Sequence, residues 1–150
     1  MTQTPAAYGT TLLRVTLGFA LIAHGPYLKP FVFGMDGASA FFDKLGLPGP
    51  LAWAVMAVEA VTGLMLVLGL QTRYAALAAL PVLLGATWAH SGNGWLFTKG
   101  GWEYPAFWAL ALAAQALLGN GALALSNALG HPDALGRFPK AQPLAARQAA

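Results

Sequence analysis

The chain contains no cysteine, and this absence removes several kinds of chemistry at once. Disulfides, thiol redox relays, cysteine-ligated zinc, iron–sulfur clusters and c-type haem attachment all need that residue. Charge is scarce as well: Asp, Glu, Lys and Arg make up 9% of the 150 residues, against roughly 25% in ordinary soluble domains. The net charge of +3 is spread over segment ends. Nucleic acid is excluded as a partner, because binding it needs a dense patch of Lys and Arg.

Apolar residues make up 57% of the chain. So few charged side chains cannot coat a globule in water, whereas a lipid bilayer suits this composition. Disorder is excluded, because it needs low hydrophobicity and high net charge. The length fits one compact unit. We therefore expect a membrane protein with the lipid bilayer as its main partner.

Four apolar stretches stand out, at residues 10–28, 51–70, 74–89 and 106–125. About 20 helical residues cross the hydrocarbon core, and the second and fourth stretches reach that length. The third is short, but Arg73 and His90 at its ends can extend to the two interfaces. The sequence predicts an all-α integral membrane protein, a four-helix bundle running up-down-up-down.

The first stretch also resembles a signal peptide, because an apolar run follows the basic Arg14. The leader before Arg14 has no charged side chain, however, and no A-x-A-like cleavage site follows Ala23. A cleaved signal peptide has a charged leader and such a cleavage site, and this stretch shows neither. We therefore favour a retained first span.

The connections between the spans differ in length. His24-Gly25-Pro26 is expected to end the first helix, and residues 29–50 to form a long loop in which 38–45 is a helix along the interface. Gln71-Thr72 is so short that the second and third helices should form an antiparallel hairpin. We divide the chain into a membrane domain, residues 1–125, and a polar, flexible tail, residues 126–150.

An even number of spans places both termini on one side of the membrane. That side carries Arg14, Arg73, Arg137, Lys140 and Arg147. The opposite side carries Lys29, Lys44 and Lys99. Because Lys and Arg are enriched in cytoplasmic loops, the termini and the tail are expected in the cytoplasm.

Arg14 shares one helix face with Gly18, Leu21 and Gly25, and Glu59 and Gln115 likewise have small residues on their helix faces. Small residues permit close helix contact, so we expect these stripes to face inward and to bury the polar side chains.

Polar side chains at membrane depth are costly and call for a role. Glu59 and Gln115 lie at about 16 Å and about 15 Å from the cytoplasmic end at a rise of 1.5 Å per residue. One hypothesis is structural: Arg14 pairs with Glu59, and Gln115 closes a buried polar network. The other is functional: Glu59, together with His24, carries a proton or binds a ligand. A buried Glu59 far from any cation would exchange a proton, whereas one paired to Arg14 would stay ionised.

Aromatic residues gather on the side opposite the termini, where all five tryptophans are expected. An aromatic belt explains part of this, but belts normally occupy both interfaces. The surplus indicates either a one-sided belt or an aromatic-lined mouth for a flat apolar ligand held by a few polar groups. The candidate ligand-binding residues are His24, Tyr27, Trp88, His90, Trp95, Glu103, Tyr104 and Trp108.

Motifs for catalysis are scarce. No G-x-G-x-x-G, H-E-x-x-H or Ser/His/Asp set occurs. His24 and His90 could ligate a haem between the first and third helices. Glu59 with the same two histidines could hold a metal. Both alternatives rest on few residues, so we assign no metal site.

Several short motifs in order resemble the DoxX family of small four-helix bacterial membrane proteins. They are L-L-R-V-T-L-G at 12–18, His24-Gly25, F-F-D-K-L-G-L-P at 41–48, Glu59 with Gly63, L-G-L-Q-T-R at 68–73, His90, Gly94, G-G-W-E-Y at 100–104 and G-N-G at 119–121. One departure is visible: Lys29 follows the His-Gly pair at a greater distance than the usual lysine of the family.

The resemblance implies a multi-pass protein of the cytoplasmic (inner) membrane that is linked to quinone and sulfur redox systems. The resemblance favours quinone as the ligand and redox enzymes as the partner proteins. Other relatives resemble receptors and assembly chaperones without catalysis. Two hypotheses follow: a quinone-interacting subunit in which Glu59 or His24 exchanges a proton, or a non-catalytic membrane partner that recruits or stabilises other proteins. Whether the chain is itself an enzyme stays open.

Overall fold

The computed structural model describes residues 4–130, and that part of the chain is helical without a strand. The main helices are α1 (Pro5–Ile22), α2 (Met35–Lys44), α3 (Leu51–Leu68), α4 (Thr72–His90), α5 (Glu103–Leu118) and α6 (Leu125–Ala128). A π-helix, η1 (Ala23–Phe33), continues α1, and two 3₁₀ turns, η2 (Ser91–Asn93) and η3 (Phe97–Lys99), lie between α4 and α5. The expectation of an all-α protein is confirmed.

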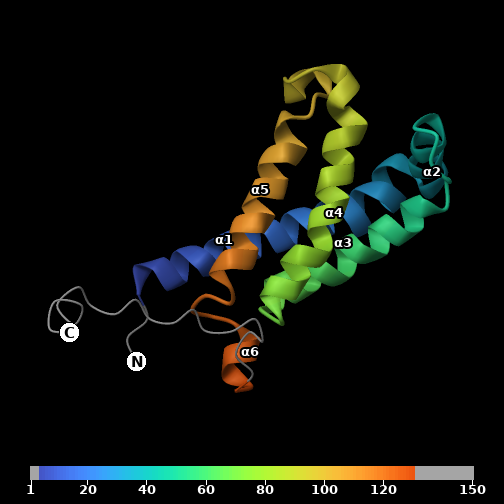
Figure 1. The fold of residues 1–150 in the computed structure, drawn as a ribbon. Helices are drawn as coiled ribbons and strands as arrows, with labels where there is room; N and C mark the ends of the chain where they lie inside the picture. The colour runs from blue at the N-terminus through green and yellow to red at the C-terminus, as the bar shows by residue number, and fades with distance from the viewer. Residues whose placement is uncertain (1–3, 131–150) are drawn as a thin grey trace, which may run out of the picture.

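The helices form two pairs that cross each other (Figure 1). α1 and η1 lie along α3, and α4 lies along α5. The core sits where the pairs meet and includes the fully buried Leu21, Leu66 and Leu112. We call one end of the molecule the N-terminal end: it holds the start of α1, the connection from α3 to α4 and the last turn of α5. At the other, the α2 end, η1 passes into α2 and α4 passes into α5.

α3 and α4 meet at the short connection around Gln71 and diverge from it (Figure 1). The predicted hairpin is present as a connection, but the helix that runs alongside α4 is α5. Gln71 itself adopts a left-handed backbone, with φ of 44°. This tight turn changes the direction of the chain within three residues.

Three helical segments are long and apolar enough to cross a membrane in the described part of the chain: Pro5–Phe33, Leu51–Leu68 and Thr72–Asn93. The fourth predicted span, residues 106–125, is not one helix. α5 has 16 residues and ends before Gly119, where φ is 83°. A positive φ suits glycine and stops the helix, so residues 119–124 form an irregular link to α6.

The first helix extends beyond the predicted stop at His24-Gly25-Pro26. It continues as a π-helix to Phe33, so the predicted loop at residues 29–50 begins only at Gly34. Pro26 and Pro30 lie inside this segment. A proline ring collides with the carbonyl four residues earlier in an α-helix, and the wider π turn, bonded five residues back, relieves that contact. The helix predicted at 38–45 is present as α2.

α1 and α3 approach closely through small residues. A Cβ atom added to Gly18 would lie 2.7 Å from the carbonyl oxygen of Gly63, which leaves no room for a side chain. The predicted inward stripe of α1 is confirmed, because Arg14, Gly18, Leu21 and Gly25 are all buried. Close backbone contact of this kind is how helices associate in membranes without a hydrophobic driving force.

Candidate functional site

A buried ion pair joins Lys29 of η1 to Glu59 of α3. The two side chains are 15% and 7% exposed, and Lys29 Nζ donates to Glu59 Oε2. The same ammonium also donates to the backbone oxygen of His24 over 3.3 Å. The predicted ion pair between Arg14 and Glu59 is therefore wrong. The extension of the helix through η1 explains the difference, since it brings Lys29 back against α3 instead of leaving it in a loop.

Gly25 makes room for this pair. A Cβ atom at that position would lie 2.7 Å from Cβ of Glu59 and 3.0 Å from Oε2. α1–η1 and α3 are thus in contact at the level of the carboxylate. The charged groups lie among apolar helices, where water cannot solvate them, so each ion depends on the other.

Three aromatic rings connect this region to α5. The imidazole of His24 packs edge-on against the indole of Trp108, with 4.8 Å between ring centroids. Tyr104 completes the group at 6.4 Å from His24 and 5.7 Å from Trp108. The indole Nε1 of Trp108 is buried and has no hydrogen-bond partner in the described part of the chain. We call His24, Tyr104 and Trp108 the ring cluster.

The other candidate ligand residues lie elsewhere. Tyr27 packs on Phe31, and Trp88 is exposed. His90 Nδ1 lies 2.8 Å from the oxygen of Gly100, and its ring contacts Phe41 of α2.

Trp95 packs edge-on against Trp102, and Glu103 accepts a hydrogen bond from the backbone N–H of Phe97. These residues belong to the link between α4 and α5. Of the eight predicted ligand residues, three form the ring cluster, three (His90, Trp95 and Glu103) lie in or beside this link, and Tyr27 and Trp88 lie apart from both. The binding role of the set stays a prediction.

Arg14 occupies the N-terminal end, where no carboxylate from residues 4–130 pairs with it. Its side chain is fully buried, and its guanidinium donates to the carbonyl oxygens of Leu66, Val67 and Leu123. The first two oxygens belong to the last turn of α3, whose unpaired carbonyls carry partial negative charge. The helix end thus takes the place that the sequence assigned to Glu59.

Gln115 is buried as predicted, but its Nε2 donates to the carbonyl oxygen of Gly119 at 2.6 Å. The polar network predicted from Arg14, Glu59 and Gln115 is thus divided between the Lys29–Glu59 pair and the N-terminal end.

A polar clasp at the N-terminal end was missed. Thr72 Oγ1 donates to Asn120 Oδ1 over 2.9 Å, and Asn120 Nδ2 donates to Asn127 Oδ1 over 3.0 Å. Ser126 donates its backbone N–H to Gly69 and accepts from the N–H of Gln71. Ordered packing therefore continues past residue 125 into α6, and the rest of the predicted tail, residues 131–150, lies outside the described residues. In the sequence, the motifs at 68–73 and 119–121 were the features that could have indicated this clasp.

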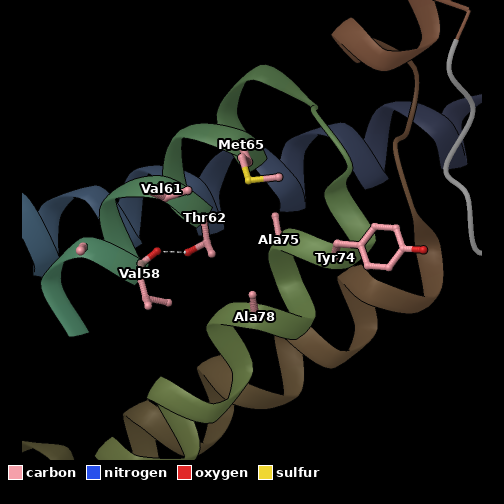
Figure 2. Close-up of a pocket in the computed structure, with 8 residues that line it drawn as sticks. Val58, Val61, Thr62, Met65, Tyr74, Ala75 and Ala78 are labelled. Carbon is pink, nitrogen blue, oxygen red and sulfur yellow. Dashed lines mark hydrogen bonds between the residues drawn. The ribbon is translucent and has the colours of Figure 1, made fainter. Parts of the chain in front are cut away.

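Two hollows are present on the described surface. One, of about 420 Å³, lies in the wedge between α3 and α4 and is shown in Figure 2. Its lining is apolar apart from two hydroxyl groups, and that of Thr62 donates to the oxygen of Val58 over 2.6 Å. The second, of about 530 Å³, lies beside the start of α5 and includes Glu103 and Tyr104.

His24 and His90, the two candidate metal or haem ligands, lie in different surroundings. No group of three His, Cys, Asp or Glu side chains gathers around a common point within residues 4–130. His24 contacts the ring cluster, whereas His90 contacts α2 and Gly100.

Comparison with known proteins gives one family and one relative. The family model described as DoxX matches residues 9–92, more than half of the chain. Over 78 residues the chain is 38% identical to "Putative oxidoreductase CatD" of Bacillus subtilis (strain 168), a stretch that covers 52% of this chain and 56% of that protein. The chain thus spans about half the length of the curated relative it matches. No solved structure matches this chain.

Proposed function

This chain belongs to the DoxX family, and on that premise we propose that it is a quinone-interacting, redox-associated subunit of a membrane assembly. The observation that carries the proposal is the Lys29–Glu59 ion pair, buried at membrane depth and close to the ring cluster. Ionisable residues in that position are costly and typically mark a path for protons, ions or substrate. The name of the relative, an oxidoreductase, agrees with redox work.

The residues present fit a quinone head group. A quinone has a flat ring and two carbonyl oxygens, so it needs aromatic walls and hydrogen-bond donors. Aromatic walls are available from His24, Tyr104 and Trp108. The buried N–H of Trp108 is a donor without an acceptor among the described residues. Leaving such a donor unpaired costs free energy, which a ligand carbonyl would recover.

When bound, a quinone supplies two-electron chemistry, because its conversion to the quinol takes up two electrons and two protons. A redox centre on a partner protein would supply or accept these electrons. Within this chain Trp108 donates to a ligand oxygen, and the rings hold the flat head group. Lys29 keeps Glu59 ionised in the absence of ligand, so the carboxylate would act as the base that accepts a proton released by a quinol.

Quinone binding can be measured by tryptophan fluorescence. Purified protein in detergent is titrated with a short-chain ubiquinone, and the dissociation constant is taken from saturable quenching. Trp108→Phe keeps the ring but removes the N–H, and should weaken binding about tenfold for the loss of about one hydrogen bond. Trp53→Phe, at an exposed position on α3, is the matched control. Equal affinity in both variants, or no saturable quenching, would favour the non-catalytic partner hypothesis.

The membrane placement is part of the proposal. α5 is proposed as the fourth span of the inner membrane, because it pairs with α4 along its length and is apolar. The termini and the tail are proposed to be cytoplasmic, so the ring cluster lies in the outer half of the bilayer. Labelling of introduced cysteines tests this orientation, as set out below.

A further inference from the structure

A hollow lies beside the first two turns of α5, apart from the Lys29–Glu59 pair. The hollow of about 530 Å³ there is bounded mainly by aromatic rings and one carboxylate. We call it the aromatic groove, and its lining residues are Trp95, Phe97, Trp102, Glu103, Tyr104, Ala106, Phe107 and Leu110. It goes beyond the proposed quinone site, with which it shares only Tyr104.

Near the start of α5 the groove combines two indole rings with a carboxylate. Trp95 and Trp102 meet edge to face with 4.6 Å between centroids. Glu103 uses Oε2 to accept from the N–H of Phe97 over 3.2 Å, and Oε1 has no hydrogen bond in the described part of the chain. Aromatic faces carry negative partial charge and bind ammonium groups. A carboxylate among such rings adds full negative charge and a hydrogen-bond acceptor.

Further along α5, the groove is lined by apolar side chains. From Glu103 to Leu110 the helix rises by about 10 Å, and the lining residues Ala106, Phe107 and Leu110 carry no polar side-chain group. Phe107 and Leu110 are 70% and 71% exposed. A ligand that fills the groove therefore has a cationic head and an apolar body beneath it.

Lys99, at the end of η3, supplies a positive charge four residues before Glu103. A ligand with a phosphate beside its ammonium would match these two charges in sign. We propose that the aromatic groove binds phosphatidylethanolamine, with the ammonium on Glu103, the phosphate near Lys99 and an acyl chain along Phe107 and Leu110. The primary ammonium is favoured over the trimethylated one because its N–H groups can donate to the carboxylate.

Native mass spectrometry of the purified full-length protein measures this preference. The protein is incubated with equimolar phosphatidylethanolamine and phosphatidylglycerol, and the two bound populations are compared. The wild-type protein should retain phosphatidylethanolamine about tenfold over phosphatidylglycerol, as expected for a desolvated ammonium among rings and a carboxylate. Glu103→Gln keeps an acceptor for Phe97 and should abolish the preference. Asp36→Asn, which removes an exposed acid on α2, should keep it.

Several outcomes would overturn the proposal that the aromatic groove binds phosphatidylethanolamine. Equal retention of the two lipids by the wild-type protein, or an unchanged preference in folded Glu103→Gln, overturns the proposal. If Glu103→Gln does not fold, Trp95→Leu, which removes an exposed ring of the groove, should reduce the same preference. Displacement of the lipid by soluble phosphoethanolamine at equal concentration would overturn the lipid as the source of the ammonium group. Lys99→Gln should weaken both lipids alike, and no change would overturn the choice of a phospholipid.

Discussion

Removing Glu59 alone should destabilise the protein strongly, because Lys29 would keep a charge in an apolar interior. The two side chains are 15% and 7% exposed, so water compensates little of the loss. Breaking a buried ion pair on one side costs about 3–5 kcal/mol in the free energy of unfolding. At about 2–4 °C per kcal/mol for a chain of this size, Glu59→Ala should lower the Tm by about 6–20 °C.

The companion variants separate the pair from simple loss of packing. Glu59→Gln keeps an amide oxygen that can accept from Lys29, so its effect should be smaller. Replacing both residues, as Lys29→Met with Glu59→Leu, should recover most of the loss, since well-packed apolar pairs often replace buried ion pairs without cost. The coupling between the two positions should exceed about 2 kcal/mol.

Thermal unfolding in detergent, followed by near-ultraviolet circular dichroism, gives these values for the wild type, Glu59→Ala and Glu59→Gln. The coupling is taken from Lys29→Met, Glu59→Leu and the variant that combines them. If the two single effects add without coupling, Lys29 and Glu59 do not interact. A Tm of Glu59→Ala equal to that of the wild type would also refute the pairing.

Three further predictions test the frame around the site. Arg14→Met should lower the free energy of unfolding by about 3 kcal/mol or more, because several charged hydrogen bonds to the end of α3 are lost; thermal unfolding measures it, and an unchanged Tm would exclude the contact. Gly18→Ala should destabilise by about 1–3 kcal/mol through overpacking, whereas Gly9→Ala, with nothing within 4 Å of its added Cβ, should not destabilise; equal effects would contradict the close approach of α1 and α3. Cysteines introduced at the exposed Leu129 and Phe97 should react with impermeant reagents from the cytoplasmic and the outer side respectively, and labelling of both from one side would overturn the topology.

Much of the helical frame could be predicted from the sequence because burial in a membrane protein follows small-residue stripes. Arg14, Glu59 and Gln115 are all buried, as expected from their neighbours on each helix face. Small residues permit close helix contact, so polar groups between them are enclosed. That logic gives burial but not partners.

The partner of Arg14 could not be predicted, because it is a set of backbone carbonyls. Every residue carries such a group, so nothing in the sequence marks the end of α3 as an acceptor. The partner of Glu59 was missed for a different reason. His24-Gly25-Pro26 indicated a helix stop, but the π-helix accommodates both Pro26 and Pro30 and keeps Lys29 on a helix beside α3.

The ring cluster was foreseen only in part. His24, Tyr104 and Trp108 were among the predicted ligand residues, and the structure brings their rings together. The remaining five were grouped with them because all were expected at one end of the bundle. Which rings at that end meet depends on how the two helix pairs cross, and helix periodicity does not determine a crossing (Figure 1).

The central claim, a quinone head group near the Lys29–Glu59 pair, is tested most directly by photolabelling. Purified protein is irradiated with an azido-quinone, and the labelled residues are identified by peptide mass spectrometry. Labels are expected in η1 and the first turns of α5, and should be reduced by an excess of short-chain ubiquinone. Labels confined to the wedge between α3 and α4, around Val61 and Ala78 (Figure 2), would contradict the account.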